Sequence, residues 1–111
     1  DAYRSLRDNV IYPSLSPKTI ADGLLTSLCE RTFSIISSKC DGILTVSEDQ
    51  IVVAMRLIWE RMKLVIEPSS AVPVAAIMSY PEYFNGKRVG VIISGGNVDL
   101  DALPFGKTLS S

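Results

Sequence analysis

A short polar segment near the carboxyl end of the chain has residue types that suit the binding of a small ligand. The segment Ser94-Gly95-Gly96-Asn97-Val98-Asp99-Leu100 directly follows the apolar run from Val89 to Ile93. A short β-branched run bounded by glycines predicts a buried strand, and ligands of open α/β sheets bind at the carboxyl ends of the strands. Glycine lets the backbone approach a ligand closely, and the Ser94 hydroxyl offers one directed hydrogen bond. For this segment taken alone, a serine that only closes a turn after the strand is an equal alternative.

The composition excludes several other kinds of site and partner. The chain has no histidine, which excludes a self-contained Ser-His-Asp or Cys-His site and a histidine-ligated zinc. The two cysteines, Cys29 and Cys40, have no metal-ligand spacing and no secretory context, so we expect reduced thiols in a cytoplasmic protein. The net charge is −1 and no basic stripe is present, so no nucleic-acid partner is expected. No apolar run is long enough for a membrane span, so no membrane partner is expected either.

The first half of the chain predicts a loop, two helices and a strand. Residues 4–16 are polar and predict a loop, and Ser16-Pro17 then opens a helix. The apolar face of that helix consists of Ile20, Leu24, Leu25 and Leu28. A second helix is predicted over residues 32–38, with buried side chains at Phe33, Ile35 and Ile36. Asp41-Gly42 predicts a turn before a short strand over residues 43–46.

The clearest helix is predicted to begin after Ser47, which forms a capping box with Gln50. The pattern places one apolar face along this helix, and Glu67-Pro68 is predicted to end it. The residues of that face are Ile51, Met55, Ile58, Met62 and Val65.

The next helix is predicted to start at Ser69 or Ser70, with Pro73 in its first turn. It carries a face of small residues at Ala71, Ala75 and Ala76, and it is predicted to stop near Ser79-Tyr80-Pro81. Asn85-Gly86 then predicts a turn before the buried strand over residues 88–93.

Helices that alternate with buried strands predict an α/β fold, in which parallel strands have helices on both faces. Two strands do not make a sheet, and 47% of the 111 residues are hydrophobic, a high share for a short chain. We therefore expect residues 1–111 to be one portion of a larger domain. The remainder of the same polypeptide would then be their first partner, covering the exposed apolar faces.

Three segments, in this order and spacing, resemble one family of enzymes. They are Thr19-Ile20-Ala21-Asp22-Gly23-Leu24, the run from Trp59 to Ala71, and the segment 94–100. Together they resemble the carboxyl-terminal third of serine racemase, the serine/threonine dehydratases and the 3-hydroxyaspartate ammonia-lyases. These are pyridoxal-phosphate enzymes of fold type II. The resemblance implies a portion of their large cofactor-binding domain, a homodimer, and a serine, threonine or 3-hydroxyaspartate substrate.

The resemblance also implies roles for individual residues. Ser94 matches the serine that bonds the ring nitrogen of the cofactor, beside Gly95 and Gly96, and Glu67 matches a glutamate that lines the ring. A hydroxyl is a weak partner and leaves that nitrogen largely unprotonated, so the ring becomes a milder electron sink. For Glu67, an equal alternative is a carboxylate that stabilises the start of the following helix.

Two further sites are implied at the edges of the resemblance. Lys63 and Asn97 match positions that help bind a nucleotide effector, although a lysine on the polar face of a helix is more often only solvated. Asp1 matches one carboxylate of a Mg²⁺ or Ca²⁺ site. Because such ions need several oxygen ligands, Asp1 alone predicts only part of a site.

The resemblance places the covalently binding lysine and the glycine-rich phosphate loop upstream of these residues. We therefore expect no catalytic residue within this chain, and no activity from it in isolation. The parent would be a lyase that eliminates water to give a keto acid and ammonia, a racemase, or both. A regulatory or interaction module is the rival from another class, but a ferredoxin-like module needs more strands. A nucleotide enzyme is a second rival, but no GxGxxG or Walker pattern is present.

Overall fold

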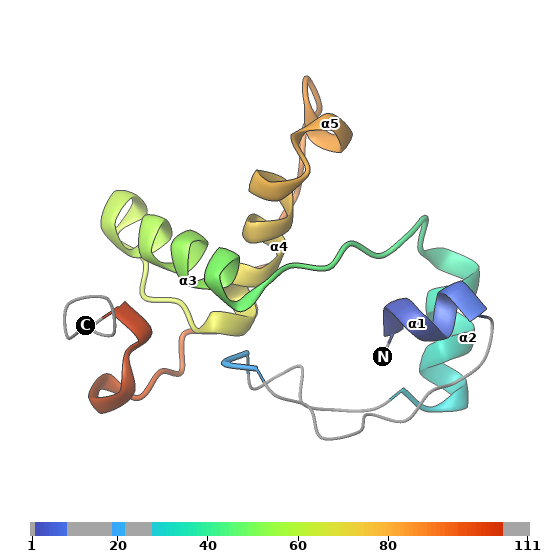
Figure 1. The fold of residues 1–111 in the computed structure, drawn as a ribbon, viewed down its shortest axis with the longest axis horizontal. Coiled ribbons are helices and arrows are strands. Elements are labelled where there is room, and N and C mark those ends of the chain that lie inside the picture. The colour runs from blue at the N-terminus through green and yellow to red at the C-terminus, as the bar shows by residue number, and fades with distance from the viewer. Residues whose placement is uncertain (1, 9–18, 22–27, 106–111) are drawn as a thin grey trace. The chain divides into compact units, whose positions relative to one another are not determined.

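The computed structural model describes residues 2–8, 19–21 and 28–105 (Figure 1). The chain divides into two compact units, one formed by residues 1–19 and 23–45 and the other by residues 20–22 and 46–111. Each unit is described by itself. Over the described ranges the regular structure is entirely helical. None of these helices combines the length and the apolar character that a membrane crossing needs.

The first unit contains helices α1 (Ala2–Asp8) and α2 (Glu30–Lys39). The loop predicted over residues 4–16 is therefore wrong for residues 4–8, and the rest of that loop lies outside the described residues. The helix predicted from Pro17 also lies mostly outside them, and its two described apolar positions, Ile20 and Leu28, are not helical. Helix α2 confirms the helix predicted over residues 32–38 and extends it by a residue or two at each end.

Helix α2 begins at a cap that the sequence pattern did not reveal. The backbone N–H of Cys29 donates to Oγ1 of Thr32 at 3.0 Å. The same hydroxyl lies 3.4 Å from Sγ of Cys29, and this hydrogen bond lowers the pKa of the thiol. The predicted burial in α2 is wrong, because Ile35 is exposed while Phe33 and Ile36 are only half-buried. Both cysteines of this unit are free and exposed.

The second unit is built on helix α3 (Glu48–Leu57), which confirms the predicted capping box. The N–H of Gln50 donates to Oγ of Ser47 at 3.2 Å, and the N–H of Ser47 donates to Oε1 of Gln50 at 2.8 Å. Two backbone donors at the helix start are satisfied in this way by local side chains. The cap is fixed by residues three apart in sequence, so it forms without help from distant parts of the chain.

Helix α3 does not continue to Glu67 as predicted. It widens into the π-helical turn η2 (Ile58–Met62) and ends at Lys63, whose φ of 59° places it in the left-handed region. A left-handed residue is a common way to end a helix. The indole N–H of Trp59 then donates to the carbonyl of Ile66 at 2.9 Å and fixes the returning chain. Met62, the last residue of η2, and Val65, beyond the helix end, are both exposed, so the predicted apolar face is wrong at these two positions.

Helix α4 (Pro68–Ser79) begins directly after its N-cap residue Glu67. The predicted start at Ser69 or Ser70 is slightly late, because Pro68 itself occupies the first helical position, where a missing N–H costs nothing. Pro73 consequently lies inside the helix and not in its first turn. Helix α4 ends at Ser79 as predicted, and the short helix α5 (Pro81–Phe84), which was not predicted, follows it.

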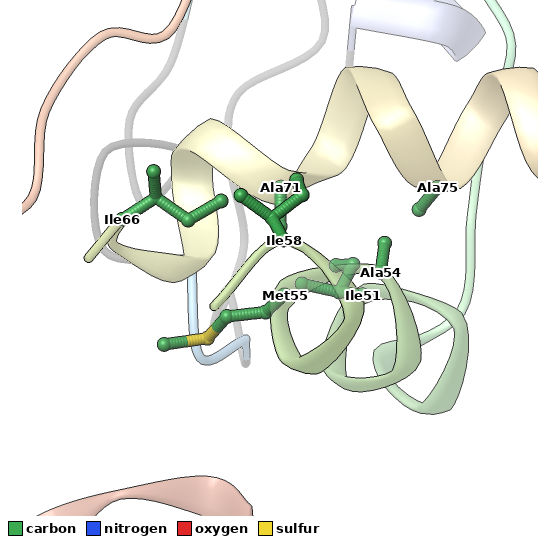
Figure 2. Close-up of a cluster of buried hydrophobic side chains, with 7 residues drawn as sticks. All are labelled: Ile51, Ala54, Met55, Ile58, Ile66, Ala71 and Ala75. Carbon is green, nitrogen blue, oxygen red and sulfur yellow. The ribbon is translucent and has the colours of Figure 1, made fainter. Parts of the chain in front are cut away.

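Helices α3 and α4 pack together around the core of the second unit (Figure 2). Ile51, Met55 and Ile58 come from α3 and η2 and Ala71 and Ala75 from α4, and all five belong to one buried cluster. Alanines let two helices approach closely, so the predicted small-residue face is confirmed at these two positions, while Ala76 is half-buried. This core holds the start of α4 in place, and the polar segment 94–96 lies against that start.

The turn at Asn85-Gly86 is confirmed, and Gly86 has a positive φ of 72°. The two predicted strands are not: residues 43–46 and 88–93 are irregular, and the described residues contain no strand. A strand needs hydrogen bonds to a neighbouring strand, and the described residues supply none. Ile92 is 84% exposed and Ile93 45%, which agrees with the expectation that these residues leave apolar faces open. The short 3-10 helix η3 (Leu100–Ala102) follows this segment.

Candidate functional site

The segment 94–96 is held against the turn that opens helix α4. The backbone N–H of Glu67 donates to the carbonyl of Gly95 at 3.1 Å. The N–H of Ser70 donates to the carbonyl of Glu67 at 3.0 Å, which closes the first turn of the helix. The structure therefore brings together Glu67 and Gly95, two residues that are 28 positions apart in the sequence.

Ser70 fixes the same segment through its side chain. Its hydroxyl donates to the carbonyl of Gly95 at 2.7 Å and accepts from the N–H of Gly95 at 2.9 Å. It also lies 3.2 Å from the hydroxyl of Ser94. Ser70 is fully buried, so these hydrogen bonds are shielded from water. The sequence pattern indicates Ser70 only as a possible start of the helix, two residues after Pro68, and nothing in that position predicts its contact with Gly95.

The two glycines of the segment leave no room for side chains. A Cβ atom on Gly95 would lie 2.7 Å from Oε1 of Glu67. A Cβ atom on Gly96 would collide with the backbone carbonyl of Val65. The close approach predicted for these glycines is therefore an approach to the protein's own residues 65–67. Whether they also approach a ligand stays a prediction.

Ser94 is exposed at the surface of the described residues, so its side chain is not part of a packed core. Its backbone neighbour Gly95 is tied down on both its N–H and its C=O, which limits where the Ser94 side chain lies. Glu67 is half-buried beside the same segment. The Ser94 hydroxyl is therefore exposed next to a backbone that is fixed by hydrogen bonds, and the Glu67 carboxylate lies against the same segment.

The other predicted site residues are placed separately. Lys63 is exposed, and its ammonium donates to the carbonyl of Glu60 at 2.6 Å. Asn97 is exposed and lines a hollow of about 320 Å³ together with Pro68, Val98 and Asp99, and Lys63 does not line it. A shared effector site for Lys63 and Asn97 stays a prediction.

Two charged side chains on the turns before Lys63 pair with each other. The guanidinium of Arg56 donates to Oε1 of Glu60 at 2.8 Å, and this hydrogen bond lowers the pKa of the Glu60 carboxyl. Both side chains are exposed, so the pair contributes little to stability.

Asp1, the predicted metal ligand, lies outside the described residues. Among the residues that are described, no three His, Cys, Asp or Glu side chains are grouped closely enough to bind a metal ion. The predicted Mg²⁺ or Ca²⁺ site therefore has no further support.

Residues 1–95 match the family model described as pyridoxal-phosphate dependent enzyme, so the chain belongs to that family of enzymes. Its members use pyridoxal phosphate as their cofactor. Among its relatives is a protein of Paracoccus denitrificans (strain Pd 1222) named beta-hydroxyaspartate dehydratase. It is 52% identical over 105 residues, which are 95% of this chain and 33% of the relative.

Two solved structures agree with this assignment. The crystal structure of serine racemase from Dictyostelium discoideum is 53% identical with a TM-score of 0.81, and the match covers 90% of this chain and 32% of that one. The crystal structure of a T.th. threonine deaminase is 44% identical with a TM-score of 0.84, and the match covers 89% of this chain and 36% of that one. The chain thus spans about a third of the length of the relatives that it matches. These relatives are fold type II enzymes, which confirms the fold family though not the parallel strands.

The residues around Ser94 suit the nitrogen-bearing edge of a pyridine ring. A ring nitrogen needs one hydrogen-bond partner, and a hydroxyl can serve it as donor or as acceptor. Ser94 provides such a group on a backbone that is fixed by Glu67 and Ser70. The contact of Ser94 with the ring nitrogen of the cofactor stays a prediction, which the hydroxyl, its exposure and its fixed backbone fit.

Proposed function

We propose that this chain forms the ring-side wall of the cofactor site in a pyridoxal-phosphate enzyme that acts on the α-carbon of a hydroxy amino acid. Residues 1–111 would be the carboxyl-terminal portion of the large domain of a serine racemase or an L-serine (threonine) dehydratase. The observation that carries the proposal is the exposed hydroxyl of Ser94 on a segment hydrogen-bonded to Glu67 and Ser70.

Pyridoxal phosphate supplies an electron-withdrawing ring that makes the α-proton of a bound amino acid easier to remove. Ser94 would hold the ring nitrogen by one hydrogen bond and so fix the tilt of the ring. Gly95 and Gly96 would keep the wall thin, because neither position has space for a side chain. Glu67 would line the ring beside them. Dehydration and racemisation both begin with loss of the same proton, so this wall serves either outcome.

A second activity is supported by one specific comparison. The relative from Paracoccus denitrificans, at 52% identity, is named for a hydroxyaspartate substrate. We therefore keep a 3-hydroxyaspartate ammonia-lyase as the alternative. Its substrate carries a second carboxylate, and the substrate comparison below distinguishes the two activities.

We also propose a compartment, an oligomeric state and an effector. Two free cysteines suit a reducing, cytoplasmic compartment. A homodimer is proposed from the family resemblance, and a nucleotide effector at Lys63 and Asn97 from the same source.

The test is a substrate comparison with the complete polypeptide that contains this chain, loaded with pyridoxal phosphate. L-Serine, L-threonine and 3-hydroxyaspartate are supplied in turn, and keto acid, ammonia and the opposite enantiomer are measured. We expect keto acid or racemised product from serine or threonine. Turnover of 3-hydroxyaspartate alone selects the alternative. A polypeptide that binds the cofactor and turns over none of the three contradicts the proposal.

A further inference from the structure

We propose that Trp59 is a positioning residue that acts on the ring-side wall of the cofactor site through one peptide group, the one between Ile66 and Glu67. The indole of Trp59 holds the carbonyl of this peptide group, and the N–H of the same group holds Gly95. The inference rests on the proposed function, because the wall is taken to face the ring of pyridoxal phosphate. Trp59 acts through its neighbours and does not itself touch the cofactor.

Two hydrogen bonds meet at the peptide group between Ile66 and Glu67. The indole N–H of Trp59 donates to the Ile66 carbonyl at 2.9 Å. The N–H of Glu67 belongs to the same peptide group, and it donates to the carbonyl of Gly95 at 3.1 Å. Because a peptide group is planar and trans, its C=O and N–H point in opposite directions. Trp59 and Gly95 therefore hold opposite sides of one rigid plane, and a tilt of that plane disturbs both hydrogen bonds.

The early end of helix α3 makes the contact of Trp59 with Ile66 possible. Residues seven apart in a continuous α-helix are separated by about 10 Å along its axis, too far for this hydrogen bond. The π-helical turn η2 and the left-handed Lys63 end the helix, and the chain then returns beside Trp59. The side chain of Ile66 lies in the buried cluster that Figure 2 shows. The core thus holds Ile66 by its side chain, and Trp59 holds it by its carbonyl.

Trp59 also contacts the second segment of the wall. Its ring meets the ring of Phe105 edge to face, with the ring centroids 5.3 Å apart and the planes at 75°. This is a preferred geometry for two aromatic rings. Phe105 follows Gly96 by nine residues along the same segment, and both rings pack against the core of the second unit. One side chain therefore holds residues 65–67 by a hydrogen bond and the segment after Gly96 by a ring contact.

The wall leaves little space for a shift of this peptide group. A Cβ atom on Gly95 would lie 2.7 Å from Oε1 of Glu67, and one on Gly96 would collide with the carbonyl of Val65. A tilt of the peptide group between Ile66 and Glu67 therefore moves the residues on which both glycines lie. The phosphate of the cofactor is expected on an upstream loop and keeps its contacts there. Loss of the indole N–H should thus change the orientation of the ring more than the affinity for the cofactor.

The first test records circular dichroism in the visible band of the cofactor bound to the complete holoenzyme, because this signal depends on the surroundings of the ring. Trp59→Phe keeps a ring beside Phe105 and removes the N–H. We expect it to weaken the signal per bound cofactor and to lower kcat by about tenfold, with KM changed by less than about threefold. Tyr83→Phe removes a hydroxyl from an exposed aromatic side chain of α5, and this matched control should change neither.

A second replacement separates the N–H from the shape of the ring. Benzothienylalanine at position 59 has nearly the shape of tryptophan but carries sulfur where the indole has its N–H. It should fold like the parent and reproduce the effects of Trp59→Phe. If Trp59→Phe does not fold, this sulfur analogue decides the question. A change in Trp59→Phe that the sulfur analogue does not reproduce overturns the proposal, because the shape of the ring then acts and not its N–H.

The dichroism also separates this proposal from the proposed function. A signal that neither replacement of Trp59 changes, while Ser94→Ala does change it, overturns the role of Trp59 and leaves the proposed function intact. A signal that none of these variants changes shows that the wall does not face the ring, and the proposed function then fails as well.

The last measurement needs no cofactor. Hydrogen exchange of the Glu67 amide in the apo form of the complete polypeptide reports whether Trp59 holds this peptide group. We expect exchange about tenfold faster in the sulfur analogue, the effect of one lost hydrogen bond. The amide of Tyr80 bonds the carbonyl of Ala76 at the end of α4 and should exchange at an unchanged rate. Unchanged exchange at Glu67, or an equal acceleration at Tyr80, would contradict a local role for Trp59.

Discussion

At the scale of single residues, the hydroxyl of Ser94 is the group that we expect to touch the cofactor. Ser94→Ala removes this hydroxyl without touching the hydrogen bonds of Gly95, which are made by Ser70 and Glu67. Cofactor affinity should stay within a few fold of the parent, because one hydrogen bond is worth about 1 kcal/mol. Turnover should fall by roughly tenfold or more, because the ring loses the partner that tunes its electronics. The measurement is kcat together with a cofactor titration. A variant as fast as the parent would remove the ring-nitrogen role.

The two neighbouring glycines should differ in their tolerance of a methyl group. A Cβ on Gly96 meets the backbone carbonyl of Val65, which cannot move without shifting the chain, so Gly96→Ala should cost about 1–3 kcal/mol of stability. A Cβ on Gly95 meets only the end of the Glu67 side chain, which can rotate away, so Gly95→Ala should cost less. Urea unfolding of the complete polypeptide measures both, and each variant controls for the other. Equal losses, or a larger loss for Gly95→Ala, would contradict the packing described.

Residue patterns revealed part of this site. The sequence singles out Ser94, Gly95, Gly96 and Glu67, and the structure places Glu67 against Gly95. It does not reveal Ser70, because a serine in the first turn of a helix is common there for local reasons. The hydroxyl of Ser70 bonds Gly95, which is far away in the sequence, and this contact is visible only in the structure.

At the scale of elements, helices α3 and α4 form the support that carries the site. Met55 of α3 is fully buried in the core of the second unit, whereas Val53 on the same helix is 53% exposed. Met55→Ala should destabilise the protein by about 2–5 kcal/mol, because it leaves a cavity under the start of α4. Val53→Ala is the matched control and should change stability by less than about 0.5 kcal/mol. The midpoint of urea unfolding checks both, and a loss from Met55→Ala no larger than the control's would show that this core does not support the fold.

Short sequence patterns predicted where helices and turns occur better than they predicted where the helices end. The capping box at Ser47 and the turn at Asn85-Gly86 involve neighbours in sequence, and both are found. The early end of α3 depends on the π-helical turn η2 and on the hydrogen bond from Trp59 to Ile66. No local sequence pattern predicts either of them. Pro68 predicts that the preceding helix has ended by Glu67. It does not predict how many residues before Glu67 that helix ends.

At the scale of the whole molecule, apolar side chains stay exposed on a segment that we expect to pair with other strands. Ile92 and Ile93 are exposed on a segment whose β-branched residues suit a strand, yet the described residues offer no strand to pair with. The chain spans about a third of the length of its relatives, so the strands that would pair with it have room in the remainder of such a protein. Strand pairing depends on residues far away in the sequence. The residues 88–93 therefore have the pattern of a strand but do not form one among the described residues.

The most direct test of this account is a crystal structure of the complete polypeptide with pyridoxal phosphate bound. We predict that residues 88–93 form a strand inside a parallel sheet, and that the hydroxyl of Ser94 lies within about 2.7–3.2 Å of the ring nitrogen of the cofactor. The hydrogen bonds from Ser70 to Gly95 should be unchanged in that structure. A cofactor bound elsewhere, or a ring nitrogen whose partner is not Ser94, would contradict the central claim that this segment is the ring-side wall of the site.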